Sequence, residues 1–349
     1  DERDFNFINI SSKQGLSSNI VNAVIKDRYG FLWFATDDGL NKYDGKNFTV
    51  YRQNTIGLVS NEILDLYEDS RGDLWIGTGE GIVQYHRKSD SFTNYPDAKN
   101  RAVLSISEDL EGNIWLGGYH GLEILNIKTR RFAEPKLSNS RYQSVFQSTI
   151  TRLLKDGRGD LWIGTPNGLF RYKRATKSLS IFKSNSSGLV DNTVNAICED
   201  KRGNIWIGTS KGLSMLDLSD YSYVNYQFEA SNRFSLSSNM VYSLAVDPHG
   251  EVWVGTEEGL NIVNPDKREV LRISKNGRNH FSLIGKAVKS IMIDEQGVYW
   301  VATFRGGVNK YDKNLAFFNL RQSNPYDPQG LNVPVITSFV QADKRYIYV

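Results

Sequence analysis

Residues 27–40 read Asp27-Arg-Tyr-Gly-Phe-Leu-Trp33-Phe-Ala-Thr-Asp-Asp-Gly39-Leu, and this stretch decides the fold. An aspartate lies six residues before the tryptophan, one glycine lies three before it, and another lies six after it. The tryptophans are 40 to 47 residues apart, a repeat length typical of propeller blades with four strands each. The sequence therefore predicts seven blades, because the same arrangement surrounds all seven tryptophans: Trp33, Trp75, Trp115, Trp162, Trp206, Trp253 and Trp300.

Each repeat contains four short segments with strand character. In the first repeat these are residues 21–25, 31–36, 40–44 and 48–51, each of a length usual for a strand. Residues 27–30 form the first turn, because an aspartate carboxylate accepts hydrogen bonds from nearby backbone N–H groups and glycine tolerates a positive φ. Helical periodicity of any length is absent from the sequence. We predict an all-β protein, a seven-bladed β-propeller of four-stranded blades.

The first strand of each repeat is suited to a crowded central axis. Aliphatic residues lie twelve and nine positions before each tryptophan, such as Val21 and Val24. The residue ten positions before the tryptophan is mostly small, with Asp65 and Arg152 as exceptions. We expect each tryptophan to wedge between neighbouring blades, where burying about 150–250 Å² of indole contributes a gross ~4–6 kcal/mol.

The count of outer strands predicts how the ring closes. Seven blades need seven outer strands, but the sequence offers eight candidates, from residues 5–10 to residues 316–320. We expect residues 5–10 to complete the last blade, because a ring closed by both chain ends has no free edge. This gives a propeller over residues 1–314. Residues 315–349 resemble the opening of the chain, so we expect them to be the first strands of a second, truncated propeller within a longer protein.

Composition argues against several kinds of site. The 42 basic and 39 acidic residues are spread along the chain without a basic stripe, so we expect no nucleic-acid partner. Cys198 is the only cysteine, which excludes an internal disulfide and a site with several thiolates. The histidines have no metal-ligand spacing, and no phosphate-binding glycine loop opens a helix, so we predict neither metal nor cofactor. The four histidines are His86, His120, His249 and His280.

Acidic residues at the turns leave an enzymatic alternative open. A glycosidase needs two carboxylates on either side of a sugar, about 5–10 Å apart. Carboxylates occur between the second and third strands of several repeats, and solvated turn charges are the simpler interpretation. A polysaccharide lyase or glycoside hydrolase on a propeller, or a protein-interaction scaffold, therefore stays as an alternative. The carboxylates in question are Asp37, Asp38, Glu80, Glu257 and Glu258.

The repeat resembles that of a known family. Residues 69–85, DSRGDLWIGTGEGIVQY, and residues 27–43 are similar to the regulator-propeller repeat of bacterial two-component sensors. The resemblance extends over residues 5–312. Three positions depart from it: Gly118 replaces threonine, and Leu125 and Leu216 replace tyrosine.

This resemblance implies a sensor rather than an enzyme. In that family two seven-bladed propellers precede a small β-sandwich, a membrane span and a histidine kinase, and many members are hybrid two-component sensors of glycan fragments in gut Bacteroidetes. It implies a periplasmic ectodomain of an inner-membrane protein, with an oligosaccharide as ligand. Its other implied partners are the second propeller and C-terminal domains of the same chain, and a second copy in a homodimer. Any kinase activity would lie outside this chain, and no ligand motif is shared by the family.

Variable loops indicate where a ligand would bind. The Asp-x-x-Gly turns are uniform across the repeats, so we expect that rim to be structural. The opposite rim holds the second-to-third strand turns and the loops that enter the inner strands, and it varies. Aromatic faces and cationic groups suit sugar recognition, and the variable loops carry both. The candidate ligand-binding residues are Tyr119, His120, Arg141, Tyr142, Lys211, Tyr242, Lys289, Phe304 and Arg305.

Overall fold

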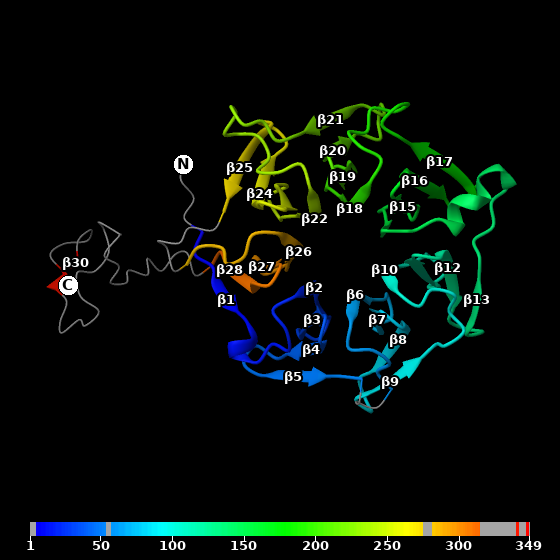
Figure 1. The fold of residues 1–349 in the computed structure, drawn as a ribbon, viewed down its shortest axis with the longest axis horizontal. Coiled ribbons are helices and arrows are strands. Elements are labelled where there is room, and N and C mark those ends of the chain that lie inside the picture. Colours follow the sequence, from blue (N-terminus) through cyan, green and yellow to red (C-terminus); the bar gives the residue numbers. More distant parts are fainter. Residues whose placement is uncertain (1–4, 54–56, 275–280, 315–339, 342–346, 349) are drawn as a thin grey trace.

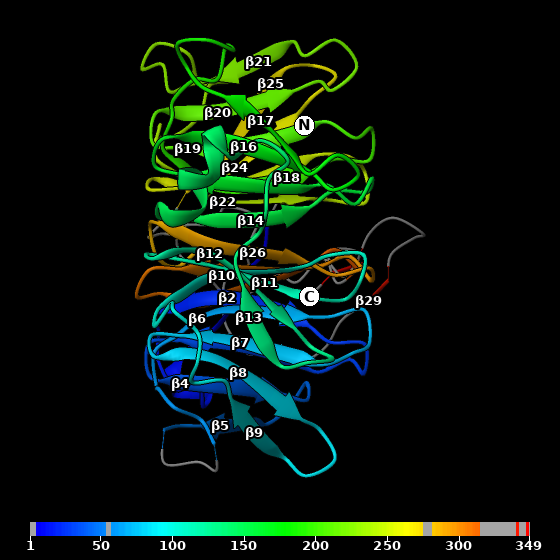
Figure 2. The ribbon, with the colours of Figure 1, turned by 90° about the vertical axis from the view of Figure 1, so that its right-hand side faces the viewer.

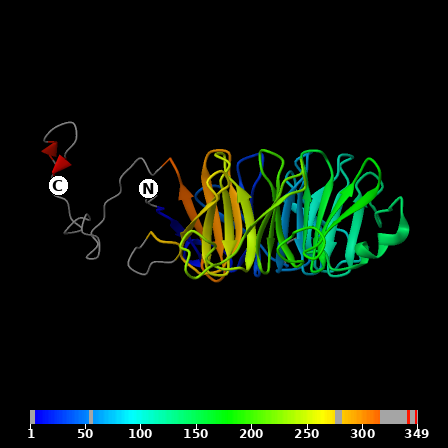
Figure 3. The same ribbon diagram turned by 90° about the horizontal axis from the view of Figure 1, so that it is seen from above.

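Seven four-stranded antiparallel sheets form a ring, which confirms the predicted propeller (Figure 1). The computed structural model describes residues 5–53, 57–274, 281–314, 340–341 and 347–348. Figures 2 and 3 show the ring edge-on from two directions, with the strands of neighbouring blades side by side.

In blades one to six the strands follow chain order from the axis outward. Blades one and two comprise β2 (Val21–Lys26), β3 (Leu32–Thr36), β4 (Gly39–Tyr43), β5 (Phe48–Tyr51), β6 (Ile63–Glu68), β7 (Leu74–Thr78), β8 (Gly81–His86) and β9 (Ser91–Asn94). Blades three and four comprise β10 (Val103–Glu108), β11 (Ile114–Gly118), β12 (Gly121–Asn126), β13 (Arg131–Ala133), β14 (Arg152–Lys155), β15 (Leu161–Thr165), β16 (Gly168–Lys173) and β17 (Ser178–Phe182). Blades five and six comprise β18 (Val194–Glu199), β19 (Ile205–Thr209), β20 (Gly212–Leu216), β21 (Tyr223–Tyr226), β22 (Val241–Val246), β23 (Val252–Thr256), β24 (Gly259–Asn264) and β25 (Glu269–Ile273).

The N-terminal strand closes the seventh blade, as predicted. Blade seven comprises β26 (Val288–Ile293), β27 (Val298–Thr303), β28 (Gly307–Asp312) and β1 (Ile8–Ile10), which pairs antiparallel with β28. The strand is shorter than the expected residues 5–10. Before it, the Phe7 N–H donates to Phe281 O at 2.8 Å, and the rings of Phe5 and Phe7 pack on Tyr311. The first residues of the segment therefore anchor the seam through aromatic packing rather than ladder hydrogen bonds.

The expected second propeller falls largely beyond the described part of the chain. Residues 316–320 and 329–332, whose likeness to the first repeat suggested it, lie outside the described residues. A two-residue antiparallel pair, β29 (Val340–Gln341) with β30 (Ile347–Tyr348), is present near the C-terminal end. The boundary at residue 315 stays a prediction.

The recurring aspartate organises each turn between the first two strands. In every blade one carboxylate oxygen accepts from two backbone N–H groups of its own turn, as predicted. In five blades the other oxygen accepts from the indole N–H of that blade's tryptophan, at 2.7 to 3.0 Å. Blades six and seven differ, because the indole N–H groups of Trp253 and Trp300 are buried without a partner among the described residues. The fixed spacing of aspartate and tryptophan thus reflects a direct bond in most blades.

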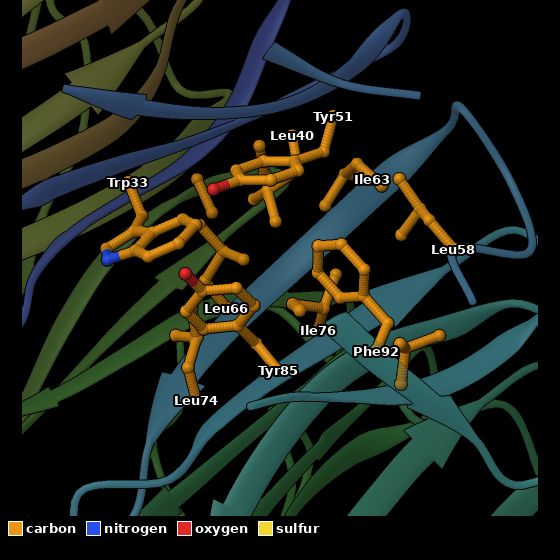
Figure 4. Close-up of a cluster of buried hydrophobic side chains, with 13 residues drawn as sticks. Trp33, Leu40, Tyr51, Leu58, Ile63, Leu66, Leu74, Ile76, Tyr85 and Phe92 are labelled. Atoms are coloured by element: carbon orange, nitrogen blue, oxygen red, sulfur yellow. The ribbon is translucent and has the colours of Figure 1, made fainter. Parts of the chain in front are cut away.

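The tryptophans fill the spaces between blades, which confirms their predicted place in the core. All seven are at most 4% exposed. Each belongs to a cluster with residues of the next blade around the ring. Figure 4 shows the cluster between blades one and two, where Trp33 packs against Tyr85 with ring centroids 4.9 Å apart and Phe92 faces Tyr51. The core is therefore seven repeated interfaces rather than one central mass.

The two exceptional residues of the inner strands contact each other. Arg152 Nη1 of β14 lies 3.8 Å from Asp65 Oδ1 of β6, so the pair spans the inner strand of blade three. Asp65 Oδ2 also accepts from the Ile106 N–H at 2.8 Å. Burial raises the pKa of Asp65, and Arg152 opposes that rise. This ion pair ties three blades together near the axis.

Among the described residues, helical structure is limited to two 3-10 segments, η1 (Ser12–Gln14) and η2 (Ser140–Gln147). In the part of the chain that the structure describes, no helix has the length and apolar character needed to cross a membrane.

Candidate ligand-binding rim

The two faces of the ring carry different loops. Backbone hydrogen bonds join the turns between second and third strands to the loops that enter the inner strands, for example Asp37 N–H to Ile20 O at 3.4 Å and Gly79 N–H to Glu62 O at 3.0 Å. We call this face the variable rim. The Asp-x-x-Gly turns lie at the other ends of the same strands, on what we call the Asp-Gly rim. This assignment agrees with the prediction from the sequence.

A β-bulge marks the second residue of the inner strand in six blades. The register shifts there, so this residue has no Cα partner in the second strand, and bulges commonly re-aim a side chain. The bulge residues are Asn22, Leu64, Leu104, Asn195, Tyr242 and Lys289. Asn22 and Asn195 donate to the first carbonyl of the next inner strand, at 2.7 and 3.0 Å. Both bulge asparagines therefore join neighbouring blades.

Tyr242 and Lys289 differ because they contact each other. Lys289 Nζ lies 3.3 Å from the centre of the Tyr242 ring, a close cation–π contact between blades six and seven. Burial lowers the pKa of Lys289, and the Glu257 carboxylate opposes this effect. Burial also raises the pKa of Tyr242, again with Glu257 nearby. The pair thus presents a half-buried cation and an aromatic ring at the variable rim, beside a carboxylate.

The neighbouring turns add exposed groups of the same chemistry. Phe304, between β27 and β28, is 42% exposed, and Arg305 Cζ lies 5.1 Å from its ring centre. Arg305 has a φ of 59°, a left-handed conformation that is unusual for a residue other than glycine. Lys286 Nζ contacts Glu258 Oε1 at 2.5 Å. Blades six and seven therefore hold aromatic rings, cations and carboxylates on adjacent loops.

The other predicted residues lie elsewhere on the rim. Tyr119 is 60% exposed in the β11–β12 turn of blade three, and the backbone N–H of His120 donates to Asn100 Oδ1. Tyr142 belongs to η2, as does Arg141, whose side chain is outside the described part of the structure. Lys211 of blade five is exposed, 3.7 Å from Asp191 Oδ1. Two blades separate blade three from blades six and seven on either side, so the nine residues are spread around the rim.

Sequence reasoning missed the bulge and the position of Glu257 beside the pair. The available signal was the residue eleven positions before each tryptophan. This position has Asn, Leu or Thr in the first five repeats but Tyr242 and Lys289 in the last two.

The side chains of the rim have the chemistry to contact a polar ligand. Sugar rings offer C–H faces to aromatic side chains and oxygen acceptors to cations. Within the described ranges, no group of three or more His, Cys, Asp or Glu side chains is placed to hold a metal ion.

Solved structures with the same fold include sensor domains and lyases. The extracellular domains of the hybrid two-component systems BT3049 and BT4673 from B. thetaiotaomicron align with TM-scores of 0.76 and 0.74, each at 24% identity. The alignment with BT3049 covers 99% of this chain and 46% of the BT3049 domain. The alignment with BT4673 covers 88% of this chain and 40% of the BT4673 domain. A streptogramin B lyase aligns with a TM-score of 0.66 at 15% identity, over 88% of this chain and 97% of its own. At these identities the likeness shows the fold alone.

Sequence comparison identifies the repeat itself. Histidine kinase P4 of Formosa agariphila is 43% identical over 51 residues, which are 15% of this chain and 4% of that protein. The chain thus spans less than half the length of the sensor domains and a small part of this kinase. The two-component regulator propeller model matches residues 15–38, 57–80, 144–167, 188–211 and 235–258. Together with the seven Asp-Gly-Trp turns, these matches identify the repeat of this chain as the two-component regulator propeller repeat.

Proposed function

We propose that this chain is the extracytoplasmic ligand-sensing domain of a hybrid two-component sensor kinase and that it recognises an oligosaccharide. The regulator propeller repeat and the names of the structural neighbours support a sensory role. The kinase would lie outside this chain, and residues 315–349 would begin the second propeller. The full-length sensor would work as a homodimer, with this domain in the periplasm.

The observation that carries the ligand proposal is the Tyr242–Lys289 pair. It joins blades six and seven through a cation and an aromatic ring, where Asn22 and Asn195 use an amide, and the Phe304 N–H donates to the carbonyl of Ala287, two residues before Lys289, at 2.8 Å. A sugar ring packed on these aromatic faces would place its hydroxyl or carboxylate oxygens near Lys289 and Arg305. We therefore assign recognition to the variable rim of blades six and seven.

A thermal-shift screen with defined oligosaccharides tests this proposal. A bound ligand raises the free energy of unfolding by RT ln(1 + [L]/Kd), which is about 2.7 kcal/mol at a hundredfold excess over Kd. We expect a subset of oligosaccharides to raise the Tm of the wild-type chain, and the Tyr242→Ala variant to lose that shift. A panel that leaves the Tm unchanged at millimolar concentration would contradict the proposal.

The same incubations test the enzymatic alternative. The family match favours a sensor, and the likeness to a lyase is limited to the fold. We expect each oligosaccharide to be recovered intact after prolonged incubation with the chain. Cleavage products detected by mass spectrometry, and absent from a heat-denatured control, would support a lyase or hydrolase instead.

A further inference from the structure

A large cavity lies on the Asp-Gly rim between blades three and four. Its volume is about 640 Å³, within the ~300–1,000 Å³ in which small-molecule sites usually fall. Tyr242 and Lys289 belong to other blades and to the opposite rim, so this cavity is separate from the oligosaccharide site proposed above. Its walls are Glu108, Asp109, Glu111, Trp115, Ile124, Ala133, Glu134, Pro135, Lys136, Lys155, Gly159, Leu161, Tyr172, Arg174, Ala175 and Lys177.

Short side chains beside the tryptophan of blade three leave this space open. Ile124 pairs with Trp115 on the third strand, and Ala133 pairs with Ile124 on the outer strand, which ends there. In blades one, four and seven the residue paired with the tryptophan holds a cation 5.3 to 5.5 Å from the indole. These residues are Lys42, Arg171 and Lys310. Trp115 therefore borders the cavity where other blades place a long side chain of their own.

The chain after Ala133 crosses to blade four and closes the outer side of the cavity. The Ser138 N–H donates to Lys177 O at 2.9 Å, and the Gln143 amide donates to Pro135 O at 2.7 Å. These bonds fix the crossing segment in place. Lys136 on this segment and Lys177 on the β16–β17 turn both line the cavity at its outer side.

Tyr172 lines the cavity with a hydroxyl that has no hydrogen-bond partner among the described residues. The residue is only 8% exposed, so its hydroxyl has little access to water outside the cavity. The corresponding tyrosine of blade two, Tyr85, donates to Asp90, five positions later, at 2.7 Å. Five positions after Tyr172 stands Lys177, which has a φ of 50°, close to the 48° of Asp90. A cation thus replaces the acceptor that blade two provides.

The charges at the cavity favour an anionic ligand. Each carboxylate there already has partners within the chain. These are Lys155 for Glu108, four N–H groups of its own blade for Asp109, Arg174 for Glu111, and Lys99 for Glu134. Within the described chain, Lys136 and Lys177 have no carboxylate within 4 Å. An anion would therefore gain two cations, whereas an added cation would find every carboxylate engaged.

We propose that this cavity binds a small aromatic carboxylic acid. Its carboxylate accepts from the Tyr172 hydroxyl and pairs with Lys177 and Lys136, in the way that Asp90 accepts from Tyr85 in blade two. Its ring packs on Trp115 and Ile124, since aromatic pairs and buried apolar area both stabilise such contacts. The ligand thereby completes an interface that the chain itself completes between blades one and two.

Calorimetric titration with 2-naphthoate and 2-naphthamide tests the carboxylate contacts, because the two compounds share a ring system and differ in charge. The wild-type chain is expected to bind 2-naphthoate at least about tenfold more tightly than 2-naphthamide, since only the anion gains charge-assisted contacts. Equal affinities for the two compounds, or no binding of 2-naphthoate at about 10 mM, would overturn the proposal.

Variants locate these contacts. Lys177→Met should weaken 2-naphthoate binding by at least about fivefold and leave 2-naphthamide within about twofold of wild type. Tyr172→Phe should also weaken 2-naphthoate, and it should leave the Tm of the free protein unchanged because the hydroxyl has no partner there. Lys267→Met, at an exposed lysine in the β24–β25 turn of blade six, is the matched control and should change neither affinity. Equal effects of Lys177→Met and Lys267→Met would contradict binding at this cavity.

D-glucuronate tests the aromatic part of the proposal, because it has the charge without an aromatic ring. It should bind at least about tenfold more weakly than 2-naphthoate, since it cannot pack an apolar face on Trp115. Equal or tighter binding of D-glucuronate would show that the site does not select an aromatic acid.

Indole N–H resonances give a readout of position in the folded wild-type chain. Each of the seven tryptophans has one such group in ¹⁵N-labelled protein, and Trp115→Phe identifies the signal of interest. 2-Naphthoate should shift the Trp115 signal more than the other six, and Lys289→Met should leave this response unchanged. A response confined to other tryptophans, or one lost in Lys289→Met, would place the ligand elsewhere and overturn the proposal.

Discussion

Single aspartates account for much of the regularity of the ring. Asp200 accepts from the backbone N–H groups of Arg202 and Asn204, from the Asn204 amide and from the Trp206 indole. Trp206 is fully buried, so removing the carboxylate leaves its N–H unsatisfied. The bond explains why the two residues keep a spacing of six positions.

We expect Asp200→Ala to lower the free energy of unfolding by about 1–3 kcal/mol, the cost of leaving buried donors without an acceptor. Urea denaturation at pH 7 measures this change. Asp37→Ala is the control, because Asp37 is an exposed turn residue, and it should change stability by no more than about 0.5 kcal/mol. Equal effects of the two substitutions would show that the bond to the indole is not needed.

Between elements, a carboxylate clamp holds blades one and two together at their outer edge. The hydroxyls of Tyr51 on β5 and Tyr85 on β8 both donate to Asp90 Oδ1, at 2.6 and 2.7 Å. These hydrogen bonds, the one from Tyr51 first, lower the pKa of Asp90. Burial raises the pKa of Tyr85 to about 12, with help from the bond to Asp90. The clamp therefore needs the charged form of the aspartate.

The clamp predicts acid sensitivity. Because the folded pKa of Asp90 lies below its unfolded value of about 3.9, its stabilisation is complete above that value and is lost as pH falls through the folded pKa. We expect Asp90→Asn to lower the free energy of unfolding at pH 7. The difference in this free energy between wild type and variant should become smaller as the pH falls below about 4. Denaturation midpoints between pH 7 and pH 3 measure this. A difference that is constant over this range would contradict the clamp.

Local patterns predicted the elements well because the determining contacts lie within one repeat. The Asp-x-x-Gly turn and the order of the strands within a blade depend on residues less than 20 positions apart. The features that the sequence did not predict depend on contacts between blades, which join residues more than 40 positions apart. The Tyr242–Lys289 contact and the diversion of Asp247 to Tyr299 are of this kind.

At the scale of the whole molecule, the N-terminal segment closes the ring by pairing with blade seven. Phe7 is 2% exposed in the seam, whereas Ile8 next to it is 48% exposed. We expect Phe7→Ala to cost about 3–5 kcal/mol, the range for truncating a buried aromatic residue. Ile8→Ala should change stability by less than about 1 kcal/mol. Urea denaturation of both variants checks this, and a small effect of Phe7→Ala would show that blade seven holds without the seam.

The candidate site was only partly predictable at this scale. The sequence showed which residues of the variable rim have suitable chemistry. It did not show which of these residues lie next to one another. The structure brings Tyr242, Lys289, Phe304 and Arg305 onto adjacent blades and leaves Tyr119 and His120 far around the ring. To group these residues into one site, the loops that meet across blade boundaries must be known. Which loops meet depends on how the ring closes.

Calorimetric titration of the oligosaccharide that gives the largest thermal shift tests the central claim most directly. Lys289→Met removes the half-buried cation at the rim, and Lys211→Met, on the same rim in blade five, removes an exposed one. The account predicts that Lys289→Met weakens binding by at least about tenfold, the loss of roughly one charge-assisted contact, while Lys211→Met leaves the Kd within about twofold of wild type. Equal affinities of wild type and Lys289→Met would contradict a ligand site at blades six and seven.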